Sequence, residues 1–450
     1  MTHGLIAAVF AAASLLALAL LYLGIRRARA AGDLDASCAL TLGAGLLITL
    51  PDAIVAFTGT LRREYDVIGN LVGVNPSWYH RVDQLMVVLL AGLALALLIP
   101  RATSPAARVN VAALLALLLW AVANLASGLH NGSMLSARAV VLGLCLAAAA
   151  VLPRGRGAAL GAGIFAVLLA AAGGLLTLFR YDVAFVVPCQ GACGGLGFTG
   201  VLPNENLLGV ALAGSIPLAY LGFRGPVRFW LSLYLAGMAI ATGSRTAAGA
   251  SVILLVALVV LRPRVDAARR SVVKTVAALT LLTASVATSV YIVRHHWPPT
   301  ALTTRPQLWE VAWHHISRAP WFGYGPNTWA TLYQSSEIPV YAQRTSHNLW
   351  TDVLFVAGGV GVAIFVSMVV TTVWTAGRAR SGVLLAFLAI SLIGTTEGAW
   401  SIGTVDFMSF TLLAILLTGE TAPAEQREWI RDPLPRTTST ARRRRSSAFA

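Results

Sequence analysis

The chain has 450 residues, of which 57% are hydrophobic and only 11% are charged. A soluble domain of this length cannot carry so little charge, because its water-exposed surface has to be largely polar. The composition therefore excludes a soluble globular protein. The formal net charge of +15 does not indicate a nucleic acid partner, since the basic residues are spread over short connections and a tail.

Long hydrophobic runs recur along the chain, each close to the roughly 20 residues that a helix needs to cross the hydrocarbon core. A β-barrel would show short alternating segments instead. The runs predict an all-α fold, a polytopic transmembrane helical bundle of about 12 or 13 crossings. They begin near Leu5, Ala39, Val82, Val109, Ala137, Ala158, Asn204, Val227, Thr246, Val272, Asn348, Val383 and Thr404.

The basic residues predict the orientation of the bundle, because lysine and arginine next to a crossing resist translocation. With the amino terminus outside, most of the 33 lysines and arginines fall in connections inside the cell. The short runs after Val383 then have to form a re-entrant turn around Thr395–Gly398. Four parts follow: a transmembrane bundle (1–293), a large, partly helical extracytoplasmic loop (294–346), C-terminal transmembrane helices (347–418) and a disordered basic cytoplasmic tail (419–450).

Two of the four cysteines, Cys189 and Cys193, lie in a predicted outer loop. That compartment is oxidising, so a local disulfide between them is expected to staple the loop. A zinc site would need two further ligands nearby, and none is evident in the sequence.

Arg245 stands at the predicted start of a crossing, near its outer end. A charge in this position is costly unless it is paired or hydrated, which makes it a candidate functional residue. The free N–H groups of a helix start also favour a bound anion. Two structural explanations stay open: the side chain extends to the interface, or it pairs with an acidic neighbour such as Glu205.

Arg305 opens a predicted short amphipathic helix in the large loop, with Thr304 suited to cap it and Pro306 suited to its first turn. The apolar side of this helix is expected to lie on the membrane surface. That side consists of Leu308, Trp309, Ala312, Trp313 and Ile316. An arginine binds phosphate oxygens through two parallel hydrogen bonds; an interfacial arginine that meets lipid headgroups is the alternative.

His347 lies where the large loop meets the next crossing, followed by Asn348. A neutral imidazole takes a proton from a sugar hydroxyl near neutral pH, so His347 is a candidate general base. A helix-end histidine bonded to the backbone is the alternative. Asn348 is expected to orient a neighbour, and Glu205, Asn206 and Glu397 are supporting polar candidates in predicted outer segments.

The adjacent pairs His295–His296 and His314–His315 are candidate metal ligands. Consecutive residues on a helix point apart, however, so each pair offers at most one ligand to a common site. We expect no metal and no other cofactor. A nucleotide-dependent enzyme is also disfavoured, because the sequence lacks a phosphate-binding Gly-x-x-x-x-Gly-Lys loop.

These motifs, in this order, resemble the O-antigen ligase and polymerase family of bacterial membrane glycosyltransferases. The resemblance rests on Ser-Arg245-Thr, Thr304-Arg305-x-x-x-Trp309, Pro320-x-x-Gly323-x-Gly325 and His347-Asn348-Leu, with Asn204-Glu-Asn-x-x-Gly209 as a further feature. It covers roughly the second half of the chain. The family often has twelve crossings with the amino terminus inside, and the thirteen runs and outside terminus predicted here depart from that pattern.

The resemblance implies an enzyme of the bacterial inner membrane that transfers a glycan from a polyprenyl (undecaprenyl) diphosphate carrier to a hydroxyl group at the outer face. The transfer would invert the anomeric carbon without metal or nucleotide. Arg245 and Arg305 match the family arginines that hold the diphosphate. His347 matches the histidine that activates or orients the acceptor, which is a glycan, a glycolipid or a protein.

Two alternatives remain at this point. A polymerase with the same chemistry would extend a repeat-unit glycan on the same carrier, and the sequence does not separate it from a ligase. A secondary transporter would need ionisable groups at mid-membrane depth, whereas here they concentrate at the predicted outer edge.

Overall fold

The structure is a computed structural model that describes residues 3–60, 62–65, 71–104, 108–132, 135–186, 197–263, 271–298, 301–338 and 345–420. The chain divides into two units, Met1–Glu420 and Thr421–Ala450. All elements described below belong to the first unit. Apart from Gly419 and Glu420, the predicted basic tail lies outside the described residues.

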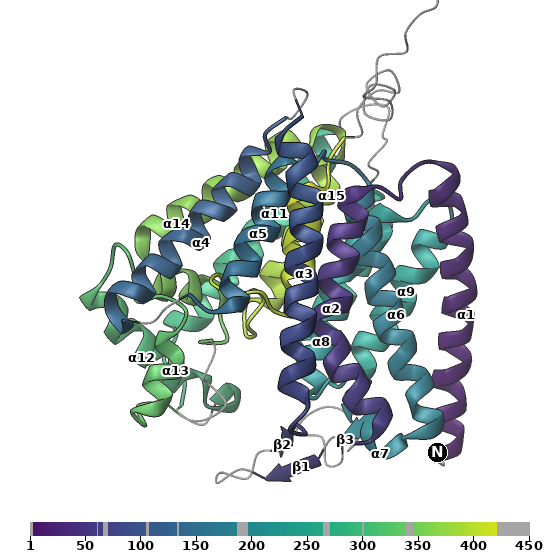
Figure 1. Cartoon of the computed structure of the whole chain (residues 1–450), viewed down its shortest axis with the longest axis horizontal. Coiled ribbons are helices and arrows are strands. Elements are labelled where there is room, and N and C mark those ends of the chain that lie inside the picture. The colour runs from purple at the N-terminus through teal and green to yellow at the C-terminus, as the bar shows by residue number, and fades with distance from the viewer. Residues whose placement is uncertain are drawn as a thin grey trace, which may run out of the picture. The chain divides into compact units, whose positions relative to one another are not determined.

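The described chain is an all-α bundle, as the sequence predicted, and each of the predicted hydrophobic runs corresponds to one helix (Figure 1). Seven of these helices are long and apolar enough to cross a membrane: α1 (His3–Ala30), α2 (Ala36–Thr58), α3 (Tyr79–Ala102), α4 (Val111–Asn131), α6 (Gly157–Phe179), α11 (Val272–Arg294) and α14 (Leu349–Thr375). The others that match a run are α5 (Ala137–Val151), α8 (Glu205–Gly222), α9 (Val227–Ala241), α10 (Arg245–Leu261), α15 (Arg380–Ile393) and α16 (Ser409–Leu417). The chain is thus a multi-pass membrane protein.

Shorter elements connect these helices. They are α7 (Tyr181–Ala184), α12 (Arg305–Arg318), α13 (Thr328–Gln334), the 3-10 turns η1 (Ala301–Thr304) and η3 (Gly377–Ala379), and two antiparallel strand pairs, β1 (Arg62–Tyr65) with β2 (Leu71–Val74) and β3 (Phe185–Val186) with β4 (Gly197–Phe198).

Many helices begin directly after a side chain that caps them. In each case an Asp, Asn or Ser oxygen accepts a hydrogen bond from a backbone N–H of the first turn, which has no partner within the helix. These capping residues are Asp35, Asn110, Ser136, Asn204, Ser244, Ser271 and Asn348. Helix starts at α8, α10 and α14 are therefore fixed locally, and these three starts carry predicted site residues.

Helix α6 lies at the centre of the packing, against α1, α2 and α8, and 72% of the residues in its most apolar stretch are buried. Small residues make this possible, because helices in lipid gain from close backbone approach. A Cβ atom at Gly222 of α8, for example, would lie 2.5 Å from the backbone nitrogen of Leu160 in α6.

The connections gather at two ends of the bundle. At one end, the His3 ring stacks on Tyr181, and Asn131 Nδ2 donates to the carbonyl of Tyr324. At the other, Arg224 pairs with Asp33, and the backbone of Gly155 donates to Leu417. We call these the site end and the far end; Figure 1 shows α12, α13, β1, β2 and α7 together at the site end.

Helix α14 is broken at Gly358, whose φ of 64° and ψ of −166° are not helical. The Pro320–Gly325 turn docks into this break: Tyr324 N–H donates to the carbonyl of Phe355, and Gly359 N–H donates to the carbonyl of Pro320. A Cβ atom at Gly358 would lie 2.3 Å from the backbone carbonyl carbon of Trp321. Glycine is therefore required by both conformation and space.

Helices α15 and α16 are short, with 14 and 9 residues. At a rise of 1.5 Å per residue they span about 21 and 14 Å, less than the hydrocarbon core of about 30 Å. Most of their side chains are buried among other helices. The segment 394–408 between them meets the start of α14, where Leu349 N–H donates to the carbonyl of Gly394 over 2.8 Å. The re-entrant turn around Thr395–Gly398 stays a prediction.

Candidate functional site

Helix α12 places Arg305 at the site end by packing its apolar face on α14. Leu308, Trp309 and Ala312 are almost completely buried, and the Trp309 indole N–H donates to the carbonyl of Ser346, 3.0 Å away. The expectation that this face lies on the membrane surface was wrong. An amphipathic pattern does not reveal whether lipid or protein covers the apolar side, and here α14 covers it.

Arg305, Glu397 and His347 form one cluster. Nη2 of Arg305 lies 2.5 Å from Oε1 of Glu397, and Nδ1 of His347 lies 3.2 Å from Oε2 of the same carboxylate. The side chains of Arg305 and His347 are 16% and 21% exposed, against 9% for Glu397. The carboxylate is therefore the most buried member of the cluster, and the side chains of Arg305 and His347 extend from it toward the surface.

The charge of Glu397 is held by these neighbours. Burial alone raises the pKa of this carboxyl, but the hydrogen bond with His347 and the charge of Arg305 outweigh it, so the pKa lies below its ordinary value of 4.5. Glu397 is therefore ionised at neutral pH and accepts hydrogen bonds from both partners.

His347 is fixed by its backbone as well as by its ring. It has a φ of 56°, an unusual conformation for a residue with a side chain. Its N–H donates to Thr345 Oγ1 over 3.1 Å, and both Thr345 Oγ1 and the N–H of Ser346 donate to the buried carboxylate of Asp352. Asp352, in the first turn of α14, thus holds the tight turn that aims the imidazole.

Asn348 forms hydrogen bonds to three neighbouring segments. Its Oδ1 caps α14 by accepting from Thr351 N–H over 3.0 Å. Its Nδ2 donates to Ser289 of α11 and to the carbonyl of Thr395, at 2.8 and 3.0 Å. Asn348 thereby ties the start of α14 to the turn that carries Glu397.

Arg245 is the first residue of α10, and its side chain is exposed. The next residue, Thr246, shares a 2.6 Å hydrogen bond with Thr396, which precedes Glu397 in the chain. The helix start that carries Arg245 is therefore held against the Glu397 turn. Among the described residues Arg245 has no ion pair, so the pairing with Glu205 that the sequence left open does not occur there.

Glu205 and Asn206 open α8, and Asn206 N–H donates to the capping side chain of Asn204 over 2.6 Å. One turn on, α8 approaches the start of α10 so closely that a Cβ atom at Gly209 would lie 2.7 Å from Thr242 Oγ1. The Asn204–Gly209 segment thus lies beside the helix start of Arg245, although no described contact joins Glu205 to the Arg305–Glu397–His347 cluster.

The remaining predictions concern cysteines and metal ligands. The proposed Cys189–Cys193 pair lies outside the described residues and stays a prediction. Within the described ranges, no group of three His, Cys, Asp or Glu residues is placed to hold a metal ion. The rings of His314 and His315 lie edge to face, with centroids 5.8 Å apart.

The sequence interpretation missed Asp352 and Thr345. Asp352 carried a usable signal, because a carboxylate within an apolar spanning run is rare and is a functional candidate by default. Thr345 carried none, since its importance comes from its position between His347 and Asp352.

Residues 230–366 match the family described as O-antigen ligase. No curated protein matches the chain, and no solved structure matches it. The matched range contains Arg245, Arg305 and His347, while Glu205 and Glu397 lie outside it. The match supports the family expected from the motifs. Residues 230–366 of this multi-pass membrane protein are similar to the O-antigen ligase family, whose general role is glycan transfer of the ligase or polymerase type.

Proposed function

We propose that this protein transfers a glycan from a polyprenyl diphosphate carrier to an acceptor hydroxyl at the extracytoplasmic face of the bacterial inner membrane. The observation that carries the proposal is the convergence of Arg305, Glu397 and His347. Arg305 comes from α12, Glu397 from the turn between α15 and α16, and His347 from the segment directly before α14. Together they bring a phosphate-binding group and a proton-accepting group to one place.

His347 acts as the general base. With its proton on Nδ1 the ring donates to Glu397, and Nε2 then accepts the proton of the acceptor hydroxyl. The hydroxyl oxygen forms a bond to the anomeric carbon as the bond from that carbon to the diphosphate oxygen breaks. The bonding electron pair leaves with the diphosphate, and a single displacement of this kind inverts the anomeric carbon.

Arg305 and Arg245 stabilise the departing diphosphate. A guanidinium has five N–H donors, and the described contacts of Arg305 use one of them on Glu397. Donors fixed in advance around a developing negative charge contribute strongly to catalysis. The carrier supplies its own activation, so the proposed reaction needs neither a metal ion nor another cofactor.

The charge distribution supports the extracytoplasmic side. The far end holds most of the short arginine-bearing connections, including those of Arg154 and Arg224, and basic connections stay in the cytoplasm. The site end is then exposed to the compartment where lipid-linked glycans and hydroxyl-bearing acceptors meet.

The test uses the full chain reconstituted in vesicles with a radiolabelled glycan on polyprenyl diphosphate and with a chelator present. We expect transfer by the wild type and a loss of at least about 100-fold for Arg305→Ala, the lower range for removal of one charge-stabilising donor. Arg318→Ala, an exposed arginine in the last turn of the same helix, is the control and should keep activity. Wild-type rates in Arg305→Ala would remove Arg305 from the mechanism.

The same assay separates a ligase from a polymerase. Label that moves onto an acceptor without a lipid diphosphate identifies a ligase. Label that stays on the carrier in longer chains identifies a polymerase.

A further inference from the structure

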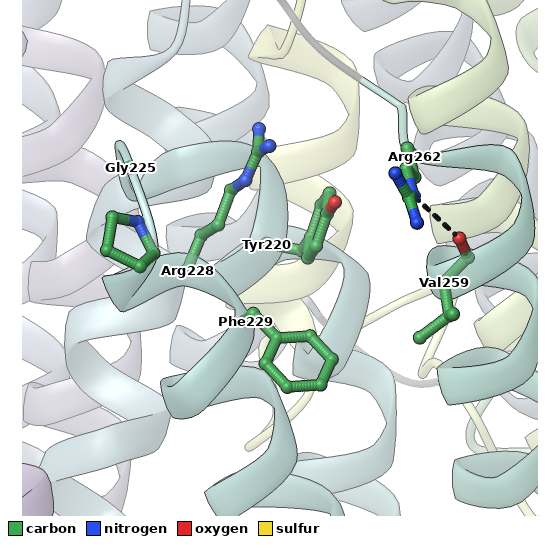
Figure 2. Close-up of a pocket in the computed structure, with 7 residues that line it drawn as sticks. Tyr220, Gly225, Arg228, Phe229, Val259 and Arg262 are labelled. Atoms are coloured by element: carbon green, nitrogen blue, oxygen red, sulfur yellow. Dashed lines mark hydrogen bonds between the residues drawn. The ribbon is translucent and has the colours of Figure 1, made fainter.

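A second cationic site lies at the far end of the bundle. A cavity of about 450 Å³ opens between the start of α9 and the end of α10, lined by Tyr220, Gly225, Pro226, Arg228, Phe229, Val259 and Arg262. Figure 2 shows the side chains of Arg228 and Arg262 on either side of Tyr220. Helix α10 has 17 residues from Arg245 to its end, so about 25 Å separates this cavity from the site end.

Both arginines are positioned by local contacts with uncharged groups. The guanidinium carbon of Arg228 lies 4.7 Å from the centre of the Tyr220 ring. Arg262 ends α10 with a φ of 43°, and its Nε donates to the carbonyl of Val259 over 3.2 Å. Within the described ranges neither side chain forms an ion pair.

A third arginine adds to the positive charge at this cavity. Nη1 of Arg27, on α1, would lie 2.9 Å from a Cβ atom built at Gly225. The described charged residues at the cavity are therefore cationic, which fits an anionic ligand.

The surroundings of the cavity are apolar and face outward from the bundle. Phe229 and Val259 are 36% and 47% exposed, and their neighbours Trp230 and Val260 are 53% and 70% exposed. On a spanning helix such side chains meet lipid tails. The complementary ligand therefore has an acidic head and an apolar body.

We propose that this cavity binds an anionic phospholipid of the leaflet at the far end, with the phosphate between Arg228 and Arg262 and an acyl chain along Phe229 and Val259. Guanidinium groups are well suited to phosphate oxygens, and a basic residue at a membrane surface attracts anionic lipid. An arginine that merely extends to the headgroup region would not distinguish one bound lipid from the bulk, whereas a lined cavity does.

The experiment measures lipids retained by the full-length protein in native mass spectrometry, after titration with phosphatidylglycerol or with phosphatidylcholine of the same chains. We expect a preference for phosphatidylglycerol that falls roughly 30-fold in the double variant Arg228→Gln, Arg262→Gln, because each basic residue contributes about a factor of five. Arg228→Lys with Arg262→Lys should keep most of the preference. Arg101→Gln, which changes an arginine at the end of α3, should keep all of it.

Equal retention of both lipids by the wild type would overturn the proposal, as would an unchanged preference in the double glutamine variant. Loss of phosphatidylglycerol on adding millimolar inorganic phosphate, without any dependence on acyl chains, would identify a free-phosphate site and would also overturn it. Thermal unfolding in neutral lipid, which should match the wild type, separates lost binding from lost folding.

Discussion

Glu397 pairs with two side chains through one carboxylate, since Oε1 faces Arg305 and Oε2 faces His347. Changing Glu397 to Gln removes the charge that orients the imidazole and leaves Arg305 without its ionic partner. We expect glycan transfer to fall by about 10²- to 10⁴-fold, the range for loss of effective general base catalysis. Rates measured with the radiolabelled carrier test this.

Glu310→Gln is the matched control for that change. Glu310 is an exposed glutamate of α12, and its variant should turn over at the wild-type rate. Comparable losses in both variants would mean that acidic charge in this region matters in general and that Glu397 has no special part.

The lowered pKa of Glu397 also predicts how stability depends on pH. Its contribution is fully present above the ordinary carboxyl value of 4.5 and is lost as pH falls through the lowered pKa of the folded protein. Thermal unfolding of the wild type and of Glu397→Gln should therefore differ most above pH 4.5 and converge in stronger acid. A gap that stays constant down to strong acid would contradict the ion-pair assignment.

At the level of elements, the break in α14 makes a sharp prediction about neighbouring glycines. Gly358→Ala places a Cβ atom against Trp321 in a conformation nearly restricted to glycine, and we expect a loss of about 1–3 kcal/mol or more in stability. A Cβ atom at Gly359 finds Pro320 O at an ordinary 3.4 Å, so Gly359→Ala should be close to neutral. Thermal inactivation of both variants distinguishes them.

The elements themselves were largely predictable from sequence, because apolar length fixes a spanning helix and polar residues such as Asn204, Ser244 and Asn348 fix its start. The environment of α12 and the break in α14 were not. Both depend on which surface an apolar face meets, and that is decided by partners distant in the chain. The Pro320–Gly325 glycines signalled a tight turn, but nothing in the local sequence showed that the turn docks into another helix.

For the molecule as a whole, the proposed orientation can be checked by cysteine labelling. Cys38 and Cys145 are buried, so replacing Cys189 and Cys193 gives a background with little reactivity. A cysteine at exposed Ser317 of α12 should react with an impermeant maleimide added to intact spheroplasts, and one at exposed Thr103 after α3 should react only once the membrane is opened. The reverse pattern would invert the topology and place the site end in the cytoplasm.

The candidate site was predictable as a set of residues but only partly as an arrangement. Family motifs singled out Arg245, Arg305 and His347, and polarity alone singled out Glu397. The carboxylate that joins two of them lies 92 residues from Arg305 and 50 from His347, and no local pattern encodes such a distance. Asp352 went unnoticed because it lies inside an apolar run that was interpreted only as a crossing.

The shortness of α15 and α16 bears on how the protein is made. Neither helix is long enough to rest in a bilayer alone, so each needs the surrounding helices before it can leave the translocation machinery. Glu397 sits between them and is delivered last, after Arg305 and His347 have been synthesised. A nascent chain that stalls before α15 would carry Arg305 and His347 without the carboxylate that they share, so the proposed site assembles only after the segment with Glu397 has been made.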